Sequence, residues 1–162
     1  MIVEGSCFLM DHANTIKGIL YLTQTKTGVV IKGTINGLAP GKHGFHIHQY
    51  GDMTDGCQSM GTHYNYHNLY HGNLTDTCKH MGDLGNITAD NTGKCYVHVK
   101  TELSLNGLYS IVGRSMVVHE KEDDLGRGGN EESKKTGNSG NRLLCGIIAV
   151  KMETSHSECA ML

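Results

Sequence analysis

The sequence predicts an all-β fold, either an antiparallel sandwich or a barrel. Its 162 residues suffice for one domain with a real core and are too few to expect two. Glycine is frequent, at 22 residues, against a single proline. Many glycines between short, partly alternating polar and apolar segments indicate strands joined by tight turns. No repeat or linker divides the chain, so we expect one domain over residues 1–152 and a polar tail over 153–162.

The segments that predict strands follow one another at short intervals. They are rich in β-branched residues, and turn residues separate them. We expect strands over residues 2–9, 15–22, 29–36, a run that includes 46–48, then 83–89, 95–101, about 108–119 and 143–152.

Two long segments break this rhythm. Residues 49–82 are rich in Gly, His, Tyr, Asn and Asp without a sustained period, and such a loop is unusual in a compact domain unless it is functional or held by something. Residues 120–141 form a second polar loop, in which Asn130 could cap a short helix with acidic residues in its first turn and lysines in its last. The alternative for this second segment is a plain solvated loop.

One predicted strand carries two histidines on one face. His46 and His48 lie in an apolar, glycine-bounded run, and residues i and i+2 of a strand point to the same side. Two imidazoles with a common aim favour a metal site, although a solvated strand face is the alternative. Histidine is also the compositional outlier, with 11 residues.

The first irregular segment adds further candidate ligands. His63, His67 and His71 have the spacing of a helical stripe, but weak helix formers and glycines crowd this region. The other interpretation is a loop folded around zinc by three histidines and a carboxylate, with His80 and Asp83 as further candidates. A bound ion can replace the core contacts that such a loop lacks.

Composition argues against several classes of function. The net charge is −2, no Lys/Arg block exists and Trp is absent, so we expect no nucleic-acid surface. The N-terminus shows no signal-peptide pattern and no apolar run could span a bilayer, so we expect a cytoplasmic protein without membrane association. The final four residues, 159–162, fit a C-a-a-X prenylation box, but one lipid signal without a polybasic stretch anchors weakly.

Several motifs resemble, in order, those of the copper–zinc superoxide dismutase family. They are GFHIHQYGD at 44–52, HG at 71–72, HMGDLGN at 80–86, VHEKEDDLG at 118–126 and GNSGNRLLCG at 137–146. The resemblance covers about residues 2–150. It implies an eight-stranded antiparallel Greek-key barrel or sandwich with two long functional loops, one metal-binding and one electrostatic. It also implies that two superoxide anions and two protons become O₂ and H₂O₂ by alternate reduction and reoxidation of an active-site copper.

The resemblance implies one copper and one zinc per chain, with defined ligands. The copper ligands would be His46, His48, His63 and His119, and the zinc ligands His63, His71, His80 and Asp83, so that His63 bridges the two ions. Imidazoles suit Cu(II), and three nitrogens with one oxygen suit tetrahedral zinc. Asp123 would link His46 to His71, whereas its neighbour Asp124 is interpreted as part of a solvated loop.

Other residues match the family's supporting positions. Arg142 would dock superoxide beside copper, and His63 would pass a proton, so these two are the predicted catalytic residues. Glu131, Glu132, Lys135 and Thr136 match the charged loop and the constriction of the substrate channel. Such a field steers small anions and makes the rate fall as salt rises.

The remaining histidines and cysteines receive simpler interpretations. The family pattern joins Cys57 and Cys145 by a disulfide bond, and Cys7 and Cys95 are expected to be free thiols. Cys78 is a candidate competing zinc ligand. His67 is expected to be a loop histidine, and His43 is expected to make structural hydrogen bonds.

The resemblance also implies partners. Superoxide is the substrate, a copper chaperone is a candidate for maturation, and a homodimer is expected with residues 50–52, 112–113 and 147–148 at its interface. A hypothesis of another class is a non-catalytic copper-binding or copper-chaperone-like module. A chaperone would be expected to carry a CxxC domain or a CxC tail, and neither is present, whereas every copper ligand is.

Overall fold

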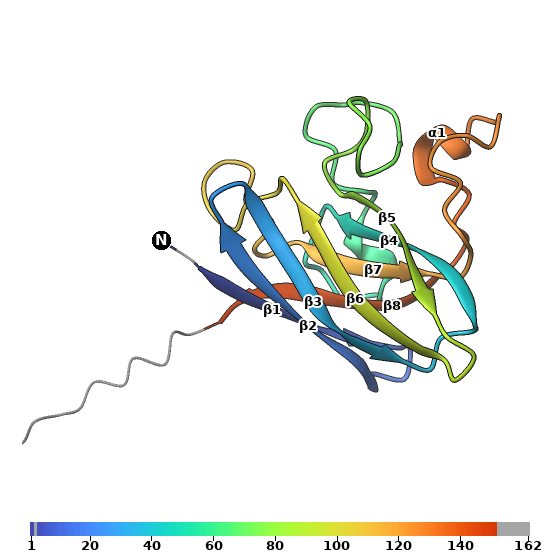
Figure 1. The fold of residues 1–162 in the computed structure, drawn as a ribbon, viewed down its shortest axis with the longest axis horizontal. Helices are drawn as coiled ribbons and strands as arrows, with labels where there is room; N and C mark the ends of the chain where they lie inside the picture. The colour runs from blue at the N-terminus through green and yellow to red at the C-terminus, as the bar shows by residue number, and fades with distance from the viewer. Residues whose placement is uncertain (2, 152–162) are drawn as a thin grey trace, which may run out of the picture.

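Eight antiparallel strands form one sheet in the order β5-β4-β7-β8-β1-β2-β3-β6 (Figure 1). The computed structural model describes residues 1 and 3–151. The strands are β1 (Glu4–Met10), β2 (Ile16–Thr25), β3 (Gly28–Asn36), β4 (Gly41–His48), β5 (Asp83–Ala89), β6 (Lys94–Thr101), β7 (Ser115–His119) and β8 (Arg142–Val150). The two edge strands, β5 and β6, contact each other, so the sheet curls into a nearly closed barrel. The predicted all-β class is confirmed.

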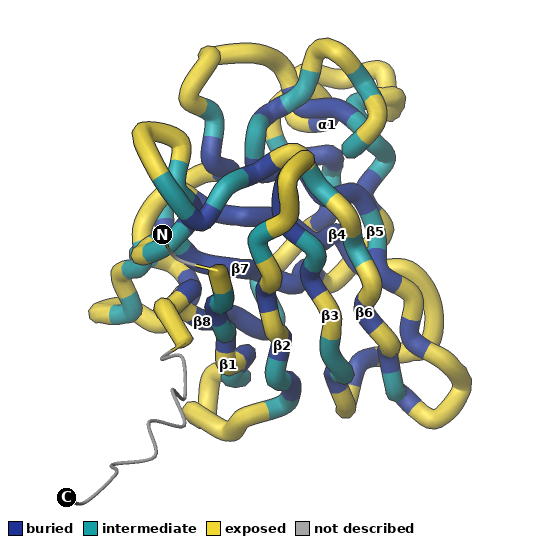
Figure 2. Tube along the Cα trace, turned by 60° about the vertical axis from the view of Figure 1, so that its left-hand side comes forward, coloured by how far each residue is buried: buried dark blue, intermediate teal, exposed yellow. Residues whose placement is uncertain are grey.

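Alternation of inward and outward side chains along the strands builds the core. In β1, Cys7 and Leu9 point inward, while Phe8 between them is exposed. The same period-2 pattern in other strands brings large aliphatic side chains such as Leu20, Ile31 and Ile148 into one cluster. In Figure 2, buried residues accordingly alternate with more exposed ones along β1 and β2, whereas β7 is buried throughout.

The predicted strand over 108–119 is too long, because β7 begins only at Ser115. Gly107 and Gly113 have φ values of 75° and 79°, in the left-handed region that breaks a strand. Only an isolated bridge between Ser104 and Ser110 forms in the preceding segment. The apolar residues just before β7, such as Ile111, still enter the core, which explains why their pattern resembled a strand.

The predicted short helix exists as the single turn α1 (Ser133–Thr136). Asn130 Oδ1 accepts a hydrogen bond of 2.7 Å from the backbone N–H of Ser133. The acidic residues precede the first turn instead of lying in it, while Lys134 occupies the last turn as expected. A 3₁₀ turn, η1 (Gln58–Met60), is the regular element of the first long segment.

The two long loops lie on the same side of the barrel. Figure 1 shows the loop between β4 and β5, in green, and the loop with α1, in orange, both beyond the strands β4, β5 and β7. They touch directly, because the backbone N–H of His71 donates to the carbonyl of Lys134 at 2.8 Å. Within the described part of the chain, no helix has the length and apolar character to cross a membrane.

The predicted disulfide bond between Cys57 and Cys145 is present and ties the first long loop to β8. The two cysteines pack with Met60 and Val117 in a small second apolar cluster. Cys7 and Cys95 are free and buried, as expected, and Cys78 is free and exposed. The C-terminal tail and its prenylation box fall outside the described residues.

Replacing both bridged cysteines by serine should lower the free energy of unfolding markedly. The bond closes a loop with a sequence separation of 88 residues. The chain-entropy model values such a loop at about 4–5 kcal/mol. Urea unfolding of the Cys57→Ser/Cys145→Ser variant measures the change, with Cys78→Ser as the matched control because its thiol is exposed and unbridged. Equal stability of the two variants would contradict this role of the bond.

Candidate metal centre

The period-2 pattern of β4 separates core from site. Phe45 and Ile47 belong to the barrel core. His46 and His48 point to the opposite face, where the long loops bury them almost completely. The strand thus presents two imidazoles to the loops, while its alternate residues, Phe45 and Ile47, anchor it in the barrel core.

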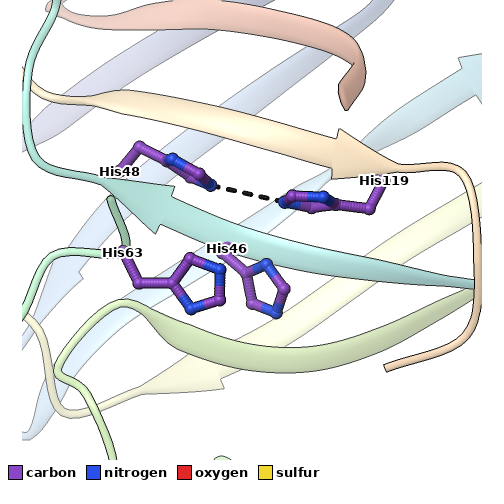
Figure 3. A group of neighbouring side chains, drawn as sticks. All are labelled: His46, His48, His63 and His119. Carbon is purple, nitrogen blue, oxygen red and sulfur yellow. Dashed lines mark hydrogen bonds between the residues drawn. The ribbon is translucent and has the colours of Figure 1, made fainter. Parts of the chain in front are cut away.

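Hydrogen bonds fix which nitrogen each predicted copper ligand offers. His48 Nδ1 donates to the carbonyl of Gly61 at 2.9 Å, and His119 Nδ1 donates to that of Gly140 at 3.1 Å. A carbonyl oxygen only accepts, so in the neutral rings both Nε2 atoms carry lone pairs. Figure 3 shows these two nitrogens facing each other, 3.3 Å apart. Two lone pairs at this distance repel unless a cation lies close to both.

The other two nitrogens of this group are buried and have no hydrogen-bond partner. They are His46 Nδ1 and His63 Nε2. Each of the four histidines offers a nitrogen within 4.8 Å of the others. Four convergent, unprotonated imidazole nitrogens fit a Cu(II) ion, and no hydrogen-bond donor among the described residues satisfies those of His46 and His63.

The second group converges on one carboxylate oxygen. Asp83 Oδ1 lies 2.9 Å from Nδ1 of both His63 and His71, and 3.2 Å from Nδ1 of His80. Asp83 Oδ2 is engaged elsewhere, because it accepts the backbone N–H groups of Gly72 and His80. Three imidazole nitrogens and one oxygen are the donor set that tetrahedral zinc prefers, so the residues fit this ion as well.

His63 belongs to both groups through different ring atoms. Its Nδ1 faces Asp83 and its Nε2 faces the copper-ligand group. Nitrogens of His46, His63 and His71 and a carboxylate oxygen of Asp83 all lie within 4.8 Å of one another. His80 nevertheless belongs with the zinc group, because its Nδ1 lies 3.4 Å from His63 Nδ1, whereas His46 Nε2 is already bonded to Asp123.

Asp123 connects the two groups from behind. Its carboxylate accepts hydrogen bonds from His46 Nε2 at 2.6 Å and from His71 Nε2 at 2.7 Å. The side chain of Asn86 bonds both the backbone N–H and the carbonyl of Asp123. Gly137 passes so close that a Cβ there would collide with the Asp123 carboxylate. This carboxylate therefore sets the orientation of one ligand from each group.

The interpretation of Asp124 as part of a solvated loop is wrong. Its carboxylate accepts hydrogen bonds from Ser133 Oγ at 2.7 Å and from Asn138 Nδ2 at 2.6 Å. Ser133 is fully buried. Asp124 thus anchors the loop that carries α1, and the adjacent acidic pair in the sequence gave no sign that both members have partners.

A cavity of about 750 Å³ leads to the copper-ligand group. Its lining joins His48, His63 and His119 to residues of both long loops, and it includes four of the predicted channel residues, namely Glu132, Lys135, Thr136 and Arg142. Glu131, the remaining one, is not part of this lining. We call this cavity the channel.

Arg142 enters the channel with its charge uncompensated. Its guanidinium donates to the carbonyls of Cys57 and Gly61, both at 2.6 Å. Among the described residues, no carboxylate lies within 4 Å of it, which excludes a surface salt bridge there. The two carbonyls and partial burial hold the cation in one orientation. Desolvation lowers the pKa of the guanidinium, but the starting value is so high that the group stays charged.

Other candidate ligands lie outside both groups. His67 packs beside Tyr66 and Tyr109 on the surface, and no helical stripe of histidines forms. Both nitrogens of His43 bond carbonyl oxygens, those of His119 and Ala39, in line with the predicted structural role. Cys78 belongs to neither group of candidate ligands.

Burial sets the protonation of the ligands. Desolvation lowers the pKa of His63 to about 3, and those of His46 and His119 to about 4. Burial also disfavours charge on His71, but its hydrogen bonds to Asp123 and Asp83 outweigh this and raise its pKa to about 9. The copper-ligand group is therefore neutral at neutral pH, as ligation requires.

The metal-free protein should lose stability as the pH falls from about 6.5 to about 4. In this window the unfolded chain takes up protons at His46, His63 and His119 that the fold resists, because their folded pKa values are lowered. Each contributes at most about 1.4 kcal/mol per pH unit. The raised pKa of His71 stabilises the fold equally throughout this window, and that contribution is lost only as the pH rises through about 9.

Urea unfolding of the metal-free chain at several pH values measures this dependence. The His46→Gln variant should have a flatter dependence than the wild type. The exposed His98 on β6 supplies the matched control, and His98→Gln should keep the wild-type slope. An unfolding free energy that stays constant over this window would contradict the prediction.

The comparisons with known proteins agree with this geometry. The family model described as "Copper/zinc superoxide dismutase (SODC)" matches residues 16–148. A Cu-Zn superoxide dismutase A from Xenopus laevis is 47% identical over 147 residues, which cover 90% of this chain and 97% of the relative. A Cu-Zn superoxide dismutase 2 from Mesembryanthemum crystallinum is 51% identical over 145 residues, 88% of this chain and 93% of the relative.

A third relative carries a location in its name. An extracellular Cu-Zn superoxide dismutase from Caenorhabditis elegans is 50% identical over 137 residues, 84% of this chain and 62% of the relative. The family model and these relatives confirm the resemblance seen in the sequence motifs. The chain belongs to the copper/zinc superoxide dismutase family.

Proposed function

We propose that this chain disproportionates superoxide with the two groups of ligands described above, one for copper and one for zinc. The family's activity makes it an oxidoreductase whose cofactors are copper and zinc. The single observation that carries the proposal is the convergence of four unprotonated imidazole nitrogens at the end of an open channel. When bound, copper supplies the one-electron redox couple, and zinc supplies charge and geometry without redox chemistry.

His63 is the proposed proton carrier. Its Nε2 faces the copper-ligand group without a protein partner, while its Nδ1 is held on the zinc side by Asp83. His63 Nε2 can therefore hold a proton and deliver it to an anion in the channel while the ring stays fixed. Peroxide formation needs two protons for each two superoxide anions, so a positioned donor removes one encounter with solvent.

Arg142 is the proposed docking group for the substrate. Its guanidinium keeps its full charge, because its partners are carbonyl oxygens, and it lines the same channel as His63. Lys135 adds charge, and Thr136 is tied to Glu132 by a hydrogen bond of 2.8 Å on the channel wall. A small anion entering a channel lined by fixed cations is attracted before it binds.

Replacing His119 by alanine should abolish superoxide consumption, because one of four convergent nitrogens is lost. His67→Ala is the matched control, since this histidine lies outside both groups. A superoxide dismutase assay after loading with copper and zinc, combined with metal analysis, separates the outcomes. A wild-type chain that binds one copper and one zinc without consuming superoxide would instead support a non-catalytic copper-binding module.

We also propose a homodimer that uses one exposed apolar face of the barrel, beside the end of β4 and β8. Tyr50 and Ile147 are exposed there, and Gly51 packs directly on the carbonyl of Gly113. Exposed apolar side chains gathered on one face favour an interface. The proposed copper chaperone for maturation and the cytoplasmic location stay predictions, and the relatives include a protein named as extracellular.

Sedimentation equilibrium should give twice the chain mass for the wild type. A charge placed in the proposed interface by Ile147→Glu should produce monomers. Tyr96→Glu is the control, because Tyr96 is also exposed but lies on β6, beside Lys94. A monomeric wild type, or equal dissociation by both variants, would remove the interface from consideration.

A further inference from the structure

Two residues outside the predicted guidance set face each other in the channel wall. Tyr70, from the loop between β4 and β5, and Lys134, from α1, both line it. The Lys134 ammonium lies 5.8 Å from the centroid of the Tyr70 ring. Tyr70 is 64% exposed and the Lys134 side chain 49% exposed, so the pair stands where the channel meets solvent.

The backbone fixes this position. The carbonyl of Lys134 accepts the N–H of His71, the residue after Tyr70, at 2.8 Å. His71 is in turn held by Asp123 and Asp83. The two sides of the channel mouth are therefore joined directly beside the zinc-ligand group, and Lys134 cannot move away from the mouth without breaking that contact.

The two lysines of α1, Lys134 and Lys135, differ in their ion pairs. Lys134 Nζ lies 3.2 Å from Glu131 Oε1, and the Glu131 side chain is 78% exposed and outside the channel lining. Among the described residues, Lys135 has no carboxylate partner within 4 Å. Lys134 is thus the channel cation whose charge is partly offset, from the solvent side.

We propose that Lys134 is a further steering residue for superoxide, held at the channel mouth by the Tyr70 ring and restrained by Glu131. The ring face attracts a cation, so Tyr70 draws the ammonium toward the opening while Glu131 pairs with it from the solvent side. This inference rests on the proposed copper site and on the anion route past Arg142. The Lys134 side chain pairs with Glu131 and not with a ligand side chain, and it acts only through its field on the approaching anion.

The two partners of the ion pair should have effects of opposite sign. A purely structural salt bridge predicts that Lys134→Gln and Glu131→Gln do similar harm, because each breaks the same contact. A steering role predicts that losing the lysine slows the reaction and that losing the glutamate speeds it. A unit charge about 10 Å from the path changes the encounter rate about twofold at low salt.

The test measures the second-order rate constant for superoxide on the copper- and zinc-loaded protein against ionic strength. Lys134→Gln should lower the low-salt rate about twofold and flatten its salt dependence, and Lys134→Arg should restore both. Glu131→Gln should raise the low-salt rate. Lys32→Gln, which removes an exposed charge from β3, controls for net charge and should change little.

A second readout does not depend on turnover. Azide, a small monovalent anion that binds Cu(II), can be titrated by absorption, and its dissociation constant should rise in Lys134→Gln and fall in Glu131→Gln. Same-direction changes in these two variants, or equal effects of Lys134→Gln and Lys32→Gln, would overturn the steering role. An inactive wild type would instead count against the proposed function itself.

Tyr70 is tested by a double-mutant cycle. Tyr70→Leu removes the ring without changing charge, so it should slow the low-salt reaction in the wild-type background and have no further effect beside Lys134→Gln. Additive effects of the two substitutions would show that the ring does not act through the lysine.

Discussion

Both predicted metal sites depend on the hydrogen bonds that the buried carboxylate of Asp123 accepts. It accepts one hydrogen bond from His46 of β4 and one from His71 of the first long loop, at 2.6 and 2.7 Å. These bonds turn the opposite nitrogen of each ring toward its own group. Asp123 itself belongs to the second long loop, so three segments distant in sequence meet at one buried charge. The loop approaches this closely because Gly137 has no side chain.

Burial of the ligands sets their protonation and also opposes folding of the metal-free chain. The imidazoles are removed from water, which keeps the copper-ligand group unprotonated. Two of their nitrogens, His46 Nδ1 and His63 Nε2, have no hydrogen-bond partners. Unsatisfied buried nitrogens oppose folding, so the ions that would ligate them also complete the fold. The disulfide bond from Cys57 to β8 restrains the same loop from its other end.

The charged residues are sorted by their partners as well as by their positions. Arg142 is held by carbonyl oxygens, which orient a cation without cancelling it. Lys134 is paired with Glu131. The Asp124 carboxylate accepts hydrogen bonds from Ser133 and Asn138 and so anchors the loop. Charges of the same loop therefore serve attraction, restraint and anchoring, because a charge acts at a distance only when no close partner offsets it.

The sequence by itself determined most of the strands, though not the start of β7, and the ligand types. Alternation in β4 separates Phe45 and Ile47 from His46 and His48, and this pattern is local, so it can be seen without a structure. Only the tertiary structure decided which nitrogen each histidine offers, that Asp124 is anchored, and that β7 starts after Gly113. These outcomes depend on contacts such as that between His46 and Asp123, 77 residues apart, whose geometry is set by packing and not by local periodicity.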